Sequence, residues 1–215
     1  MAANRARGQR AGLTRQAVLE AALRLVDEEG LKALSMRRLG AELGVEAMTL
    51  YHHVPNKTAL LDGMIEQVVA EAVPPEFGAG TWREDLSAYA RALVAALGAH
   101  PHAAPLLLSR PALTPRNLGT LEAVVEMLHE AGFSLPRTLD VLYSLTSFAV
   151  GHAAAHAGRI DGAGSLASLD PTAYPLLVAA AREAGEDAAE ARFDFALAAL
   201  LSGFERELAG TSATG

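Results

Sequence analysis

The fold of this chain is decided by residues 35–57, which read SMRRLGAELGVEAMTLYHHVPNK. Ser35 can cap a short helix over 36–43, and Gly44 can make the tight turn that ends it. A second short helix over about 46–53 follows the turn and can pack on the first through its apolar side chains. Two short helices joined by a glycine turn have the layout of a helix-turn-helix.

Helical periodicity continues on both sides of this stretch. An apolar face between Thr14 and Gly30 predicts a helix that these two residues cap and terminate. Asn56 can cap a further helix that begins at Lys57 and ends before Pro74. Beyond it, capping residues and prolines predict helices over 82–100, 103–109, 115–132, 135–159, 171–184 and 186–209. No segment alternates like a strand, so the predicted fold class is all-α.

The same signals divide the chain into four parts. Residues 1–12 form a basic tail that we expect to be disordered, and residues 13–56 form the helix-turn-helix domain. Residues 57–73 form a connecting helix that ends at Pro74-Pro75, and residues 76–210 form a helical bundle. The predicted architecture is a three-helix amino-terminal domain followed by a larger helical domain.

The formal net charge of −7, taken alone, argues against a nucleic-acid partner. The charge is unevenly distributed, because residues 1–60 carry a net +3 and the remaining residues carry −10. A basic amino-terminal part on an acidic body suggests a DNA-binding module attached to a second domain. A basic tail that is merely solvated is the alternative.

The composition excludes several classes of protein. With no cysteine among its 215 residues, the chain has no disulfide, zinc ribbon or cysteine nucleophile. The amino-terminal arginines precede no apolar run, and the most apolar stretch, 141–158, is interrupted by serine, threonine and histidine residues. We therefore expect a cytoplasmic protein with no membrane partner. Because no nucleophile–base–acid constellation is present, we expect neither enzyme activity nor a cofactor.

The second short helix is expected to lie in the major groove of DNA. Thr49 offers a hydroxyl and a methyl group, which suit a phosphate oxygen or a thymine methyl, and an arginine of the preceding helix can reach a guanine edge or a phosphate. An ordinary helical hairpin without a DNA partner is the alternative. The candidate DNA-contacting residues are Arg37, Arg38, Met48, Thr49, Tyr51, His53 and Lys57.

The string LGVEAMTLYHHVPNK over residues 43–57, followed by Leu60-Leu61, resembles the signature of the tetracycline-repressor (TetR) family. The resemblance covers about residues 13–70 and implies a DNA-binding domain. Met48 stands where a proline is common in the tetracycline repressor itself. The family's operator contacts fall on Arg37, Thr49, Tyr51, His53 and Lys57.

A weaker resemblance to the same family extends through residues 76–210. It implies a dimeric helical bundle with an inducer pocket, and hence a repressor that binds a palindromic operator as a homodimer and is released by a small molecule. The segments that carry it are Thr81-Trp82, Ser109-Arg110-Pro111, Ala131-Gly132-Phe133-Ser134 and Leu201-Ser202-Gly203-Phe204-Glu205.

The resemblance also indicates what the effector is not. Leu106, Ala155, Tyr89 and Val73 occupy the positions that hold Mg²⁺ and the drug in the tetracycline site, so tetracycline–Mg²⁺ is not the expected inducer. We expect an apolar effector with a few polar groups. A close-packed core with no cavity, and a partner protein as the signal, are the alternatives. The candidate ligand-binding residues are Tyr89, Leu93, Leu106, Ser109, Arg110, Val124, Leu128, Tyr143 and Ser147.

The histidines allow a different interpretation. His152 and His156 are four residues apart and share a helix face, which is a spacing typical of metal ligands. His100 and His102 flank Pro101. A metal-dependent helical enzyme or a metal sensor that uses His152 and His156 is therefore the alternative function. Neutral histidines that line a pocket or a dimer interface are the interpretation that we prefer.

Two long helices carry the residues expected at the dimer interface. Small residues on one helix and larger ones on the other allow a four-helix contact across a two-fold axis, and that symmetry requires a palindromic operator. The residues are Ser144, Ser147, Gly151, Ala154 and Ala155 on the first helix, and Phe195, Ala198, Ala199, Ser202 and Phe204 on the second.

Overall fold

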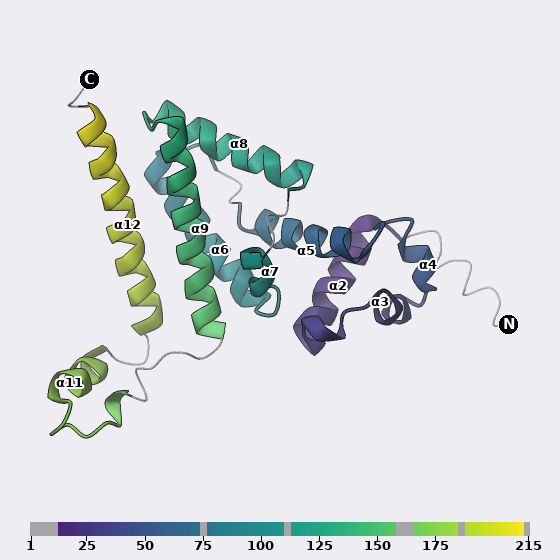
Figure 1. The fold of residues 1–215 in the computed structure, drawn as a ribbon, viewed down its shortest axis with the longest axis horizontal. Coiled ribbons are helices and arrows are strands. Elements are labelled where there is room, and N and C mark those ends of the chain that lie inside the picture. Colours follow the sequence, from purple (N-terminus) through teal and green to yellow (C-terminus); the bar gives the residue numbers. More distant parts are fainter. Residues whose placement is uncertain (1–12, 74–76, 110–112, 158–165, 185–187, 213–215) are drawn as a thin grey trace.

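The computed structural model describes residues 13–73, 77–109, 113–157, 166–184 and 188–212, and these residues form helices and turns but no strand. The predicted all-α fold is confirmed. The expected basic tail and Arg110 lie outside the described residues. Figure 1 shows a small group of helices, α2 to α5, at one end of the molecule and a larger group, α6 to α12, at the other. We call these two groups the head and the body.

The head begins its helices at side-chain caps. Thr14 Oγ1 accepts a hydrogen bond from the Ala17 amide at 3.1 Å, and Asn56 Oδ1 accepts one from the Ala59 amide at 2.8 Å, as the capping signals predict. The helices are α2 (Arg15–Glu29), the 3₁₀ turn η1 (Leu31–Ala33), α3 (Met36–Glu42), α4 (Ala47–Leu50) and α5 (Lys57–Glu71).

The core of the head is made by leucines of all four helices, including Leu19, Leu39, Leu50 and Leu60, each of which is buried. The long helices α2 and α5 cross closely at Gly63, where an added Cβ would lie 2.6 Å from Leu19 Cδ2. The absence of a side chain at Gly63 therefore leaves room for Leu19 of α2 to pack against α5.

The body is built around α6, which packs along α9 in its centre (Figure 1). A capping box starts α6: Thr81 Oγ1 accepts from the Glu84 amide, and Glu84 accepts from the Thr81 backbone N–H and hydroxyl, which lowers the pKa of Glu84. The helices are α6 (Trp82–Ala99), α7 (Ala104–Ser109), α8 (Pro115–Glu130), α9 (Leu135–Ala157), α11 (Pro175–Ala184) and α12 (Ala188–Ser212).

Two predicted helices are several residues shorter in the structure. The helix expected from Pro171 starts at Pro175, because Pro175 has no N–H to donate to the Pro171 carbonyl; residues 171–173 form a turn instead. The helix expected over 46–53 is regular only over Ala47–Leu50.

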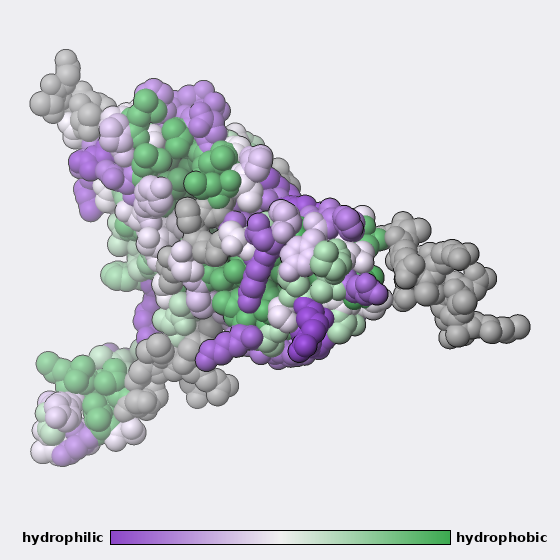
Figure 2. Space-filling view, turned by 45° about the vertical axis from the view of Figure 1, so that its right-hand side comes forward, coloured by the Kyte–Doolittle hydropathy of each residue, from purple (hydrophilic) through white to green (hydrophobic). Residues whose placement is uncertain are grey.

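The helix α11 lies away from the other helices, at the lower left of Figure 1. Its two leucines are exposed, Leu176 to 84% and Leu177 to 48%, whereas Val178 is buried. Figure 2 shows the same lobe standing apart from the rest of the surface with hydrophobic residues displayed on it. No helix within the described ranges is long and apolar enough to cross a membrane.

Candidate nucleic-acid interface and ligand site

The turn between α3 and α4 has the geometry of a tight helical corner. Ser35 Oγ accepts from the Arg38 amide at 3.1 Å and starts α3, and Gly44, with φ +66°, adopts the left-handed conformation that ends it. The Val45 amide donates to Gly40 O at 2.9 Å, and an added Cβ at Gly40 would lie 2.9 Å from Val45 O. The backbone after the turn therefore packs directly on α3.

The helix α4 buries one side and exposes the other. Leu50 is buried against the head core, whereas Met48 is 70% exposed and Tyr51 is 41% exposed. Thr49 and His53 are half-buried. This segment is short, but its side chains stand on the surface, as a helix that enters a DNA groove requires.

The segment after α4 keeps backbone hydrogen bonds but winds more tightly than an α-helix. The His53 amide donates to Leu50 O at 2.9 Å, a bond between residues three apart, and the Val54 amide donates to the same oxygen at 2.9 Å. Pro55 follows and disfavours helical backbone at the residue before it. The observed helix is therefore shorter than the predicted one, although Tyr51, with φ −65° and ψ −17°, keeps a helical conformation.

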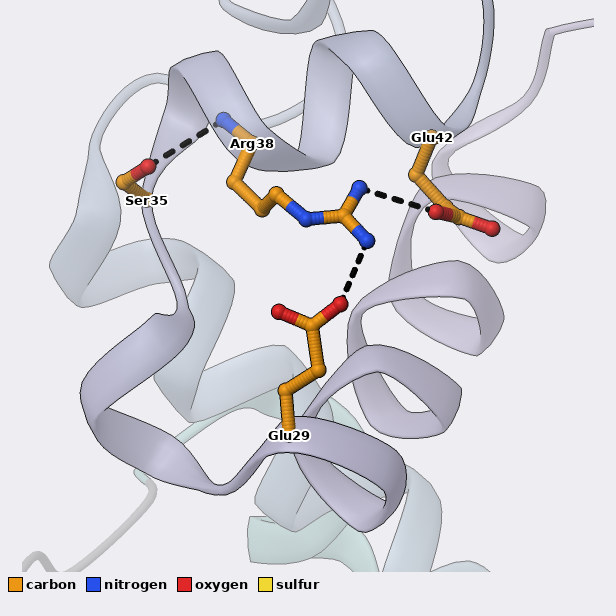
Figure 3. A network of polar contacts seen from close by, with 4 residues as sticks. All are labelled: Glu29, Ser35, Arg38 and Glu42. Atoms are coloured by element: carbon orange, nitrogen blue, oxygen red, sulfur yellow. Dashed lines mark hydrogen bonds and ion pairs between the residues drawn. The ribbon is translucent and has the colours of Figure 1, made fainter.

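Two neighbouring arginines of α3 differ in their surroundings. The Arg38 guanidinium donates to Glu29 at 2.5 Å and to Glu42 at 2.9 Å (Figure 3), and these bonds hold the pKa of Arg38 above its usual value. Within the described part of the chain, Arg37 makes no ion pair, and its side chain is exposed. Arg38 thus joins α3 to the end of α2, whereas the charge of Arg37 faces solvent.

Lys57 has two features at the start of α5. Its Nζ donates to Leu34 O at 2.7 Å, which fixes α5 to the segment that leads into α3. Its side chain remains exposed, and an ammonium group has three donors. The head therefore offers the cations Arg37 and Lys57 beside the exposed residues of α4.

The core of the body brings together most of the predicted apolar ligand residues. Tyr89 is buried beneath α9, where its hydroxyl shares a hydrogen bond with Thr146, and its ring contacts Phe77 edge-on at 6.4 Å between centroids. Burial raises the pKa of Tyr89, while the bond to Thr146 opposes this shift. The apolar members of the group, from α6, α7 and α8, are also buried: Leu93, Leu106, Val124 and Leu128.

Three predicted ligand residues are not part of this core. Tyr143 is 68% exposed and Ser147 is also exposed, because both lie on the outer side of α9. Ser109 is exposed, and its hydroxyl donates to carbonyls of its own helix, Pro105 O at 3.1 Å and Leu106 O at 3.2 Å. The polar partner of Tyr89 that the sequence analysis missed is Thr146.

The signal for Thr146 is the apolar spacing of α9. Leu142, Leu145 and Ala149 are buried and define the inner face of the helix. Each residue advances an α-helix by about 100°, so Thr146 lies at the edge of this face and Ser147 lies beyond it. A shift of one residue along α9 therefore decides whether a side chain lies at the core or faces solvent.

His152 and His156 stack in parallel, with 6.3 Å between ring centroids and 9° between planes. His152 also lies 4.9 Å from Phe193, within a cleft of about 500 Å³ between α6, α9 and α12. Burial lowers the pKa of His152, and the nearby His156 and Arg192 lower it further. No group of three histidine, aspartate or glutamate side chains in the described residues is arranged to hold a metal ion. The geometry is that of aromatic packing.

Several of the residues expected at a dimer interface are exposed on α9 and α12, whereas Ser202 accepts a hydrogen bond from Arg83 of α6 at 3.0 Å and Phe204 packs against the core. Phe195 is 77% exposed, and Ser144, Ser147, Gly151 and Ala199 are exposed as well. A groove of about 650 Å³ runs between α9 and α12. Its lining includes Tyr143, Ser144, Ala199, Gly203 and Phe204.

A helix-turn-helix head joined to a helical body defines a transcriptional regulator of the DNA-binding class. Residues 18–64 match the family of bacterial regulatory proteins named tetR, and residues 74–208 match the tetracyclin repressor-like C-terminal domain. The chain belongs to the TetR family of transcriptional regulators.

Relatives and solved structures of the family agree over most of the chain. The tetracycline repressor protein class D of Escherichia coli is 32% identical over 208 residues, which cover 92% of each protein. The HTH-type transcriptional repressor DrrR1 of Streptomyces coeruleorubidus is 38% identical over 148 residues, which cover 68% of this chain. The structure of apo ActR from Streptomyces coelicolor superposes with a TM-score of 0.77 at 30% identity and covers 94% of this chain and 98% of ActR.

The region that matches covers less than two thirds of the length of two relatives. It covers 55% of the length of DrrR1 and 61% of the length of an HTH-type transcriptional regulator from Saccharopolyspora erythraea.

Proposed function

We propose that this protein represses transcription as a homodimer on a palindromic operator and that an apolar small molecule releases it. The observation that carries the proposal is the α3–turn–α4 unit, which exposes Met48 and Tyr51 on a head that also exposes the cations Arg37 and Lys57. We assign residues 13–56 to DNA binding, 57–73 to the connecting helix and 76–210 to effector binding and dimerisation.

In this proposal the head residues have distinct roles. Thr49 and Met48 face base edges, Arg37 and Lys57 pair with phosphates, and Tyr51 and His53 bond to the DNA backbone. Arg38 acts through α3, because two carboxylates already neutralise its guanidinium.

The outer side of the body supports a homodimer. Tyr143 and Phe195 are large exposed hydrophobic side chains of α9 and α12, and the groove between these helices has small residues that allow another helix to approach closely. The exposed apolar face of α11, with Leu176 and Leu177, is a further surface that a second copy can cover. A two-fold dimer then presents two heads to two half-sites.

The effector is proposed to enter the core around Tyr89. Its apolar part would lie among Leu93, Leu106 and Leu128, and a polar group would bond to Tyr89 or Thr146. ActR, a relative at 30% identity, has been solved in complex with actinorhodin, which supports a small-molecule effector in the same family. Release follows if the effector binds the DNA-free conformation more tightly.

DNA binding is tested by fluorescence anisotropy with DNA from upstream of the protein's own coding sequence. We expect saturable binding that weakens as salt rises, with two chains per palindrome by light scattering. Arg37→Ala should weaken binding, whereas Arg116→Ala, an exposed arginine of the body, should not. Equal binding of a scrambled duplex, or a monomer at micromolar concentration, would count against the proposal.

A further inference from the structure

One imidazole joins the body to the head. His100 follows α6 directly, and its Nδ1 lies 2.7 Å from Asp27 Oδ2 on α2. Its Nε2 lies 3.4 Å from Glu71 Oε2 at the end of α5. The neighbouring His102 Nδ1 lies 3.2 Å from the Asp27 backbone oxygen. We call the contacts of His100 with Asp27 and Glu71 the His100 bridge.

The bridge is placed where it can restrain the head. The side chains of His100 and Asp27 are 18% and 24% exposed, so solvent screens their interaction less than that of a surface pair. Both ring nitrogens face carboxylate oxygens, and an imidazolium can donate to both. Asp27 Oδ1 is buried and has no hydrogen-bond partner among the described residues, so His100 provides the side-chain contact of this carboxylate.

The chain leads from the proposed effector core to the bridge without interruption. Tyr89 and Leu93 lie on α6, and His100 follows the last residue of the same helix, about 16 Å along the axis from Tyr89 at 1.5 Å per residue. His100, with φ −124° and ψ 61°, leaves the helical conformation and turns toward α2. A displacement of α6 by a ligand therefore moves the imidazole relative to both carboxylates.

We propose that the His100 bridge sets the angle between the head and the body and couples effector binding to head orientation. This inference rests on the proposed function for its biological meaning, but the restraint itself is a property of the single chain. His100 is a positioning residue, because no DNA contact is assigned to it.

The restraint is tested without DNA in the full chain. The protein has no cysteine, so Lys32→Cys in the head and Glu126→Cys in the body, both exposed, accept one spin label each. Labelled chains are diluted with excess unlabelled protein, so that pulsed dipolar spectroscopy reports the distance between labels within one chain. We expect a narrow distribution that widens in Asp27→Asn and widens further in His100→Leu, which also removes the contact with Glu71.

Matched variants separate the bridge from general loosening. Arg15→Gln removes a 3.5 Å ion pair to Glu66 within the head and should leave the distribution narrow. The double variant His100→Leu/Asp27→Asn should widen it no more than His100→Leu alone, because His100→Leu already removes the contact with Asp27. An unchanged width in both single variants, with unfolding temperatures near that of the unsubstituted protein, would overturn the proposal.

A second readout uses operator DNA. A bridge that fixes head orientation should make operator binding sensitive to the spacing of the two half-sites. The unsubstituted protein should therefore bind the native palindrome more tightly than a palindrome with one inserted base pair. His100→Leu should reduce the ratio of these two affinities by several fold. An equal ratio in both proteins would contradict the coupling. If no operator binds the unsubstituted protein, the proposed function fails while the spin-label result still decides the restraint.

Discussion

The head and the body are both built from α-helices, but their candidate functional residues occupy opposite places. In the head, short capped helices hold a small leucine core, and the candidate functional residues, such as Met48 and Arg37, stand on the surface. In the body, the candidate effector residues, such as Tyr89, are buried, and the outer faces of α9 and α12 remain uncovered. The helix-turn-helix motif predicts directly which candidate residues of the head are on the surface. Which residues of the body are buried depends on how each helix is rotated about its axis.

The largest expected effect tests whether destabilising the head and destabilising the body have different consequences for operator binding. Leu39→Ala in the head and Leu93→Ala in the body each remove a fully buried side chain and should lower the free energy of unfolding by about 2–5 kcal/mol. Urea unfolding followed by circular dichroism measures this loss.

Operator binding distinguishes the two truncations. Leu39→Ala should abolish it, because α3 loses its anchor, while Leu93→Ala should preserve it below the unfolding transition. Operator affinity reduced equally by both variants would show that head and body do not fold as distinguishable units.

Next in size is the buried hydroxyl pair of the body. Thr146→Val leaves the Tyr89 hydroxyl buried without its partner and should cost about 2 kcal/mol of stability. The double variant Tyr89→Phe/Thr146→Val removes both polar groups and should cost less than the single variant. Thermal unfolding measures both, and a double variant less stable than Thr146→Val would contradict this account.

The two arginines of α3 provide a matched pair in the head. Arg37→Ala should lower operator affinity roughly tenfold and reduce the slope of log affinity against log salt by about one. Arg38→Ala should change this slope little, because Glu29 and Glu42 already balance the guanidinium. Equal changes of slope in both variants would mean that Arg38 leaves its carboxylates when DNA binds.

The smallest expected effect is a pH dependence of body stability. The pKa of His152 is lowered in the folded chain, so the unfolded chain binds more protons once the pH falls to about the usual histidine value of 6.5. Stability should therefore decrease from pH 7.5 to pH 5.5. His152→Leu should reduce this decrease in the unfolding temperature, whereas His52→Leu, in an exposed position of the head, should retain it. An identical decrease in all three proteins would argue against a contribution from His152.

The head could be predicted from the sequence almost completely. Thr14, Ser35 and Asn56 act as the caps that their positions suggest, because a cap depends only on a few neighbouring residues. The ion pairs of Arg38 were not predicted. Its pairing with Glu29 joins residues nine apart across the end of α2, and local pattern alone does not show such a contact.

The body was less predictable because its functional groups are defined by packing. Tyr143 and Thr146 lie on the same helix, yet the first is exposed and the second contacts Tyr89. A difference of one residue in the assumed orientation of α9 places Ser147 instead of Thr146 in the core. Neither the position of α11 nor the His100 bridge leaves a signal in local sequence, since both depend on residues far apart in the chain.

Gly40 bears on the proposed DNA binding, although it has no side chain that could contact DNA. Because an added Cβ there would lie 2.9 Å from Val45 O, a single hydrogen atom sets the clearance between α3 and the segment that leads into α4. That clearance in turn sets how far α4 protrudes from the head. Gly40 is therefore a spacer behind α4, and in the proposed function it limits how deeply α4 can enter a groove.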